Sequence, residues 1–156
     1  MSDLIARKDG KAGRFTLNRP GALNALTYEM CLQIESYLGK WEADPDIELI
    51  LFEGAGERAF CAGGDITAMY KTALAGDYDY GRQFWTDEYR LNAKLATSDK
   101  PIVSFLQGFT MGGGVGLGCP PPHRLVSASS QLPVPECRLG LVPDCGVSLL
   151  LDRPPR

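Results

Sequence analysis

Histidine is almost missing from this 156-residue sequence, in which His123 is the only one. The five cysteines form no CxxC pair, whereas a zinc site needs Cys or His ligands at close, regular spacings. A catalytic triad also needs a histidine, but His123 lies in "HRLVSAS", a stretch typical of a strand. The sequence therefore favours neither a zinc site nor a histidine triad, and we interpret His123 as structural.

Long apolar segments and runs of basic residues are also absent. No segment approaches membrane-spanning length, and the amino terminus "MSDLIARKDGKAG" has no apolar signal core. The net charge is -3 and the 16 Lys and Arg residues are dispersed, so we expect no binding to nucleic acid or to membranes. Five cysteines cannot all pair, and reduced thiols are typical of the cytoplasm. We therefore expect a cytoplasmic protein, or a mitochondrial-matrix protein if a targeting segment precedes this sequence.

The residues that are present form an α/β pattern. The composition is 44% hydrophobic and 22% charged, as in globular proteins, and the length suits one domain over residues 1–156. Strands are predicted over residues 13–18, 48–52 and 101–108. The last two are continuous apolar runs, as in strands that are covered on both faces.

Two helices are predicted between these strands from apolar residues at helical spacing. Thr27 is a good N-cap residue for the first helix, whose apolar stripe consists of Met30, Ile34, Leu38 and Trp41. The second helix covers about residues 81–96, with Phe84, Leu91 and Leu95 on one face. Glu88 falls on that same face, where a buried unpaired charge is expensive. From the residues alone, Glu88 either reaches solvent at the edge of the stripe or faces a pocket.

Two glycine-rich loops, "CAGGD" and "MGGGVG", each follow a predicted buried strand. Ligands bind at such strand ends in α/β sheets, and two backbone N–H groups that converge there would make an oxyanion hole. The alternatives are a tight turn in which Asp65 caps the next helix, and glycines 112–114 that only allow close helix packing. Neither loop fits a dinucleotide-binding or P-loop motif.

Four longer motifs occur in the order "NRPGALNALT", "ERAFCAGGDI", "KPIVSFLQGFTMGGGVGLG" and "PECRLGLVPDCGVSLL". Together they resemble the crotonase (enoyl-CoA hydratase/isomerase) superfamily, most closely its 3-hydroxyisobutyryl-CoA hydrolase branch. The resemblance implies a crotonase-like spiral of ββα units that binds acyl-coenzyme A thioesters. The family domain continues beyond the last motif, so we expect residues 1–156 to be its amino-terminal part, with the spiral incomplete at the carboxyl terminus.

The resemblance also implies which residues bind the thioester. The two N–H groups that hold the thioester carbonyl in an oxyanion hole would be those of Gly64 and Gly113. Ala62, Asp65 and Ile66 would contact the substrate, the last two from a loop that lies along the coenzyme A moiety.

Carboxylates separate the hydratases of this superfamily from the hydrolases. The hydratases use two glutamates, and at the first of these positions this sequence has Gly116, which cannot take a proton. The second position is Glu136, which is followed by Asp144, and this pattern resembles the hydrolase branch with both acids at the thioester. In that branch a glutamate at the position of Glu88 contacts the hydroxyl of the acyl group.

The function that the resemblance implies is acyl-CoA thioester hydrolysis. The expected reaction is that of 3-hydroxyisobutyryl-CoA to 3-hydroxyisobutyrate and CoA, in valine catabolism. Glu136 would attack the carbonyl or activate a water, and Asp144 would orient the reacting groups. No metal or other cofactor is expected, because coenzyme A is part of the substrate. The alternatives are an enoyl-CoA hydratase or isomerase and a non-catalytic remnant; the acyl preference and a homo-oligomer are left open.

Overall fold

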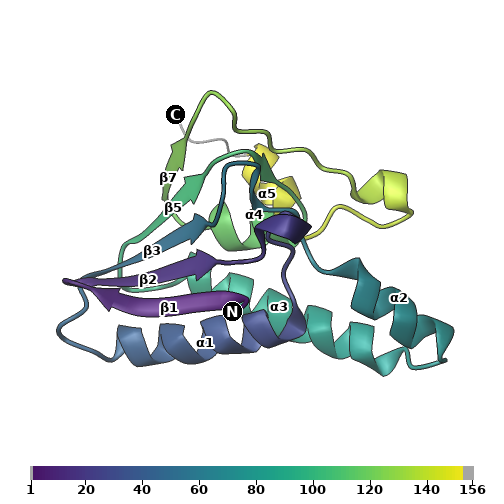
Figure 1. Ribbon diagram of the computed structural model, residues 1–156, viewed down its shortest axis with the longest axis horizontal. Helices are drawn as coiled ribbons and strands as arrows, with labels where there is room; N and C mark the ends of the chain where they lie inside the picture. Colours follow the sequence, from purple (N-terminus) through teal and green to yellow (C-terminus); the bar gives the residue numbers. More distant parts are fainter. Residues whose placement is uncertain (1, 153–156) are drawn as a thin grey trace.

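A computed structural model describes residues 2–152 (Figure 1). Its strands are β1 (Leu4–Asp9), β2 (Ala12–Leu17), β3 (Leu49–Gly54), β4 (Ala59–Cys61), β5 (Ile102–Leu106), β6 (Phe109–Thr110) and β7 (His123–Val126). Its α-helices are α1 (Tyr28–Glu42), α2 (Ile66–Leu74), α3 (Asp79–Ala96), α4 (Gly113–Gly118) and α5 (Val147–Asp152). Two short 3-10 helices are η1 (Pro20–Ala22) and η2 (Glu136–Leu139).

The strands form two sheets. A five-stranded sheet has the order β1-β2-β3-β5-β7, with β1 antiparallel to β2 and the other neighbours parallel. A separate two-stranded sheet pairs β4 with β6 in parallel. In two successive turns of the chain, a strand of the large sheet is followed by a strand of the small sheet and then by helix. This is the predicted spiral of ββα units.

Helix α1 begins at the predicted cap and packs on the sheet through the predicted stripe. The Thr27 side chain accepts a hydrogen bond of 3.2 Å from the Met30 N–H, so one of the free donors of the first turn is satisfied. The stripe of Met30, Ile34, Leu38 and Trp41 is buried as predicted. The Trp41 ring lies 4.4 Å from that of Phe15 in β2, which anchors the helix against the sheet.

The central strands β3 and β5 of the large sheet are buried on one face, whereas the edge strand β7 has no buried residue. Ile50 and Phe52 of β3 are buried, whereas Leu51 between them is only half-buried. Strand β5 repeats this alternation, with Phe105 half-buried. Figure 1 shows α1 and α3 side by side beneath β1 and β2. The prediction that β3 and β5 are covered on both faces is therefore wrong for residues 2–152, because apolar residues occur on both faces while these helices cover one.

The glycine-rich loops leave the small sheet, not the long buried strands as expected. β4 and β6 are three and two residues long, too short for an alternating pattern to reveal them in the sequence. They pair with Cys61 beside Thr110, so the loops that follow them start side by side.

Within residues 2–152, no helix combines the length and the apolar composition that crossing a bilayer requires.

Candidate active site

The two glycine-rich loops converge, as predicted from their positions in the sequence. A Cβ atom placed on Gly113 would lie 3.4 Å from the Gly64 nitrogen, and one on Gly63 would lie 3.5 Å from the Gly113 nitrogen. No backbone hydrogen bond among residues 2–152 uses the N–H of Gly64 or of Gly113. Two neighbouring, unpaired donors are therefore available to one acceptor, which is the arrangement of an oxyanion hole.

Local geometry explains the glycines at the start of α4. Gly112 has φ 51° and ψ -126°, a conformation that side chains rarely allow. Gly113 is the first residue of α4, where the N–H has no intrahelical partner. A side chain on Gly113 would also collide with the carboxylate of Glu88. Both explanations for these glycines therefore apply: they allow close packing, and the N–H of Gly113 remains available for an oxyanion hole.

Most predicted site residues line one cavity of about 100 Å³ beside these loops. The cavity lies between α3, the two glycine loops and the η2 region, and Phe84, Trp85 and Met69 form much of its apolar wall. The predicted site residues that line it are Ala62, Gly64, Ile66, Glu88, Gly113, Glu136 and Asp144. Segments that are distant in the sequence are thus brought to one place.

Asp65 is the one predicted site residue that does not line this cavity. Its carboxylate caps α2 by accepting a 3.0 Å hydrogen bond from the Thr67 N–H, and it pairs with Arg19 at 2.9 Å. Although burial pushes the pKa of Asp65 up, hydrogen bonds from Arg19 and Thr67 hold it below its usual value. The helix-capping alternative therefore describes Asp65, and its predicted contact with substrate stays a prediction.

Glu136 is the carboxylate most available for chemistry. It is 5% exposed at the start of η2, and neither of its buried oxygens has a hydrogen-bond partner in the described part of the chain. A Cβ on Gly112 would lie 3.6 Å from its Oε1 atom, so the carboxylate lies against the oxyanion loop. An acid that is buried without a partner beside two free N–H groups is suited to act as nucleophile or base.

Glu88 also lacks a partner, and its surroundings favour the neutral form. The residue is 2% exposed, and its buried Oε1 atom has no hydrogen bond within residues 2–152. Burial, and then the charge of Asp144, raises the pKa of Glu88 to about 8. At neutral pH the carboxyl group therefore retains its proton and can donate a hydrogen bond into the cavity.

Two residues near these acids were missed by the sequence reasoning. Tyr89 donates a 2.5 Å hydrogen bond from its hydroxyl to Oδ2 of Asp144. The Asn92 side chain lies over Gly116 so closely that any Cβ there would collide with it, and both of its polar atoms lack partners among the described residues. The only signal was helical spacing: Asn92 is four residues after Glu88 and shares its face.

His123 is exposed in β7 and does not line the cavity. Among the residues that the structure describes, no group of three or more His, Cys, Asp or Glu side chains could hold a metal ion. The five cysteines have no disulfide between them, and Cys145 is buried directly after Asp144. The candidate site therefore consists of backbone donors and carboxylates.

The sequence matches the enoyl-CoA hydratase/isomerase family over residues 12–156. The chain belongs to this family. It is 43% identical to the mitochondrial 3-hydroxyisobutyryl-CoA hydrolase of Gallus gallus over 152 residues, which are 97% of this chain and 39% of the relative. With the Homo sapiens protein of the same name it shares 42% identity over 151 residues, again 97% and 39% of the two chains. The chain thus spans about two fifths of the length of these relatives.

Solved structures of relatives have the same fold. An enoyl-CoA hydratase from Rhodobacter sphaeroides 2.4.1 is 53% identical with a TM-score of 0.95, over 99% of this chain and 46% of that one. A carnitinyl-CoA dehydratase from Mycobacterium thermoresistibile is 43% identical with a TM-score of 0.95, over 99% and 45%. The predicted crotonase fold is confirmed for this part of the family domain.

Proposed function

We propose that this chain carries the thioester-binding and hydrolytic residues of an acyl-CoA hydrolase that acts on 3-hydroxyisobutyryl-CoA. The observation that supports this most is the cavity in which the unpaired amides of Gly64 and Gly113 meet the unpartnered carboxylate of Glu136. The substrate is taken from the names of the curated relatives at 42–43% identity.

In the proposed reaction the two amides donate hydrogen bonds to the thioester carbonyl oxygen. They stabilise the negative charge that develops on this oxygen when the carbonyl carbon is attacked. Loss of one such donor typically reduces the rate about 100- to 1,000-fold, because the site has few other groups that stabilise the charge. Gly64 and Gly113 therefore act through the backbone, and only a change of the backbone would remove them.

Two routes use Glu136 from this position. In one, its carboxylate attacks the carbonyl carbon, the C–S bond breaks, and water then hydrolyses the acyl anhydride. In the other, Glu136 takes a proton from a water whose oxygen attacks the same carbon. In both, the CoA thiolate leaves and is protonated, and the acid product forms. Asp144 orients the reacting groups, and protonated Glu88 donates to the acyl hydroxyl.

The partner in this proposal is the acyl-CoA substrate, with no metal or other cofactor, nucleic acid or membrane. The mitochondrial names of the curated relatives favour the mitochondrial matrix over the cytoplasm. A homo-oligomer is compatible with the proposal and is not required by it.

Enoyl-CoA hydration is the second candidate, favoured by the 53% identity to the Rhodobacter sphaeroides enoyl-CoA hydratase. Addition of water to a double bond needs a base for the water and an acid for the adjacent carbon. Gly116 provides neither, and Asn92 fills the space above it. Hydrolysis needs one attacking carboxylate and an oxyanion hole, so the described residues support it better.

The test is incubation with 3-hydroxyisobutyryl-CoA and with crotonyl-CoA, following thiol release and enoyl absorbance together. Glu136→Gln should lower thiol release by about 1,000-fold with little change in CoA affinity, because the amide is a poor nucleophile and base. Glu42→Gln, at an exposed position of α1, is the matched control and should behave like the native chain. Near-normal thiol release in Glu136→Gln, or hydration that exceeds hydrolysis, would contradict the proposal.

A further inference from the structure

Asp144 is tied to a helix that is remote in the sequence. The hydroxyl of Tyr89, in α3, donates to Oδ2 of Asp144 at 2.5 Å across 55 residues of chain. Tyr89 directly follows Glu88 in α3. Glu88 lines the small cavity, and Tyr89 donates a hydrogen bond to Asp144, which lines the same cavity.

The loop that carries Asp144 provides little to hold the side chain. Cys145 and Gly146 have φ angles of 51° and 76°, so the chain turns sharply directly after the aspartate. The local backbone bond, from the Val147 N–H to the Asp144 carbonyl at 3.0 Å, fixes the main chain and not the carboxylate. Within the loop only the thiol of Cys145, a weak donor, hydrogen-bonds to the carboxylate, so the Tyr89 hydroxyl from outside the loop is the stronger donor that orients it.

Asp144 has two cavities beside it. One is the cavity of about 100 Å³ at the glycine loops, and the other is a larger one of about 520 Å³ that Tyr89 also lines. The titratable groups around the carboxylate are Glu88 and Tyr89 of α3, Glu136 of η2 and the adjacent Cys145. None of these is a cation, and Glu88 is neutral at neutral pH, so the Tyr89 hydroxyl, with the weaker Cys145 thiol, is the donor that opposes repulsion between the carboxylates of Asp144 and Glu136.

We propose that Tyr89 is a positioning residue, which holds the Asp144 carboxylate at the wall of the small cavity where Glu136 reacts. The inference rests on the proposed hydrolysis and assigns Tyr89 no contact with substrate. Tyr89 is 42% exposed, but the partial burial of its hydroxyl and the hydrogen bond to Asp144 raise the pKa of Tyr89, so the hydroxyl remains a donor throughout the neutral range.

The contact itself can be measured without any activity. The tyrosinate absorbance of Tyr89 is obtained as the difference between the chain and its Tyr89→Phe variant over an alkaline titration. We expect Tyr89 to titrate at lower pH in Asp144→Asn than in the native chain, because the negative charge that opposes ionisation is gone. Identical titrations of Tyr89 in the two backgrounds would overturn the proposal.

The positioning role is tested by a double-mutant cycle on thiol release. Tyr89→Phe should lower kcat about tenfold and leave KM within about twofold, since it removes one hydrogen bond to a charged group. It should also shift the acid limb of the pH–rate profile, and it should have no further effect in the Asp144→Asn background. Tyr78→Phe, at an exposed position before α3, is the matched control and should leave rate and profile unchanged.

Equal losses from Tyr89→Phe in both backgrounds would show a structural role and overturn the proposal. Circular dichroism of each variant separates unfolding from a change in rate. A native chain that releases no thiol would contradict the proposed function instead, while the titration would still decide whether Tyr89 holds Asp144.

Discussion

Asp87 and Glu88 are consecutive residues of α3, 4% and 2% exposed, but their surroundings are opposite. Asp87 faces α1 and is fully bonded: Tyr28 donates to it at 2.5 Å, Gln83 at 2.9 Å, and Arg90 pairs with it at 2.7 Å. Glu88 faces α4, and its buried oxygen has no partner among residues 2–152. One helix thus has a face that is paired and a face that is not.

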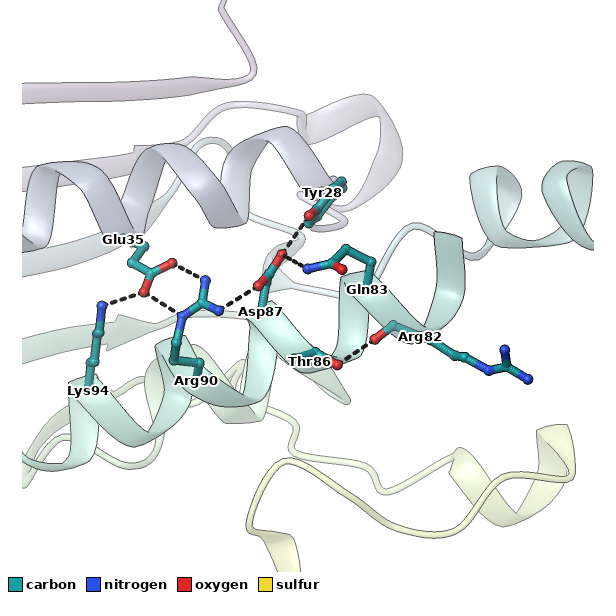
Figure 2. A network of polar contacts seen from close by, with 8 residues as sticks. All are labelled: Tyr28, Glu35, Arg82, Gln83, Thr86, Asp87, Arg90 and Lys94. Carbon is teal, nitrogen blue, oxygen red and sulfur yellow. Dashed lines mark hydrogen bonds and ion pairs between the residues drawn. The ribbon is translucent and has the colours of Figure 1, made fainter. Parts of the chain in front are cut away.

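The paired face joins α3 to α1. Figure 2 shows Arg90 between Asp87 and Glu35 of α1, with Lys94 on the same glutamate. Arg90 donates to both oxygens of Glu35, at 2.8 and 2.7 Å, and this bond, aided by Lys94, lowers the pKa of Glu35 to about 2. Bonds from Gln83 and Tyr28 likewise hold the pKa of Asp87 below its usual value.

The comparison separates two uses of a buried acid. An acid whose pKa is lowered by partners stabilises the folded state, because its charged form is bonded there. An acid whose pKa is raised by burial destabilises the folded state at high pH, so it is retained where its proton or charge serves a reaction. Asp87 is of the first kind, and we assign Glu88 to the second.

The largest expected effect is on the pH dependence of stability in Glu88→Gln. Between the usual pKa of 4.5 and about 8, the folded chain binds a proton on Glu88 that the unfolded chain releases. The free energy of unfolding should therefore fall as pH rises through this window, at about 1.4 kcal/mol per unit of pKa shift. The free energy of unfolding of Glu88→Gln lacks this fall. The difference in unfolding free energy between Glu88→Gln and the native chain should therefore grow in favour of the variant by roughly 3 to 5 kcal/mol from pH 5 to pH 9.

Urea unfolding of the two proteins at pH 5, 7 and 9 measures this difference. Asp144→Asn should recover a smaller part of the gain, because burial is the larger cause of the shift and the Asp144 charge the lesser. Parallel stability curves for the native chain and Glu88→Gln would contradict the assignment of a proton to Glu88 at neutral pH.

Asp87→Asn should lower the free energy of unfolding by about 2 to 3 kcal/mol, because an amide cannot accept hydrogen bonds from Tyr28, Gln83 and Arg90 together. The contribution of Asp87 to stability changes with pH in the direction opposite to that of Glu88. The folded pKa is lowered, so this stability is present above the usual pKa and is lost as pH falls through the folded value. The loss in Asp87→Asn should accordingly be largest near neutral pH and shrink on acidification.

Asp79→Asn is the matched control on the same helix. Asp79 pairs with Arg82, but both side chains are mostly exposed, so its loss should cost less than about 1 kcal/mol. Equal losses in the two variants would mean that burial and partners do not distinguish the paired face of α3.

The sequence predicted the positions of α1 and α3 because each has an apolar stripe, and Thr27 has the chemistry of a cap. It also predicted that Glu88 shares the buried face of α3, and that the glycine loops converge on Gly64 and Gly113. Family motifs supplied Glu136 and Asp144, which no periodicity marks. Local patterns and motifs were sufficient for these elements.

Pairings across the fold could not be predicted in this way. The bond from Tyr89 to Asp144 and the contact of Asn92 with Gly116 depend on how α3 meets α4 and the loop before α5. The bond from Arg19 to the Asp65 carboxylate is likewise a pairing across the fold, whereas the Asp65 cap of α2 was one of the alternatives that the sequence offered and its contact with substrate stays a prediction. The partner of a polar side chain is set by tertiary packing, which sequence spacing does not report.

The smallest expected effect concerns Asn92, the other unpartnered group on the face of Glu88. Alanine in place of a helical glycine normally raises the free energy of unfolding by about 1 kcal/mol. At position 116, however, a Cβ atom would collide with the Asn92 amide. Gly116→Ala should therefore destabilise the chain by about 1 to 2 kcal/mol. In an Asn92→Ala background the collision is gone, and Gly116→Ala should become stabilising.

Gly39→Ala, in α1 with open space around its Cβ position, is the matched control and should stabilise both backgrounds equally. Urea unfolding of the six proteins measures the coupling, and a Gly116→Ala effect that is independent of residue 92 would show that Asn92 does not occupy the space above Gly116.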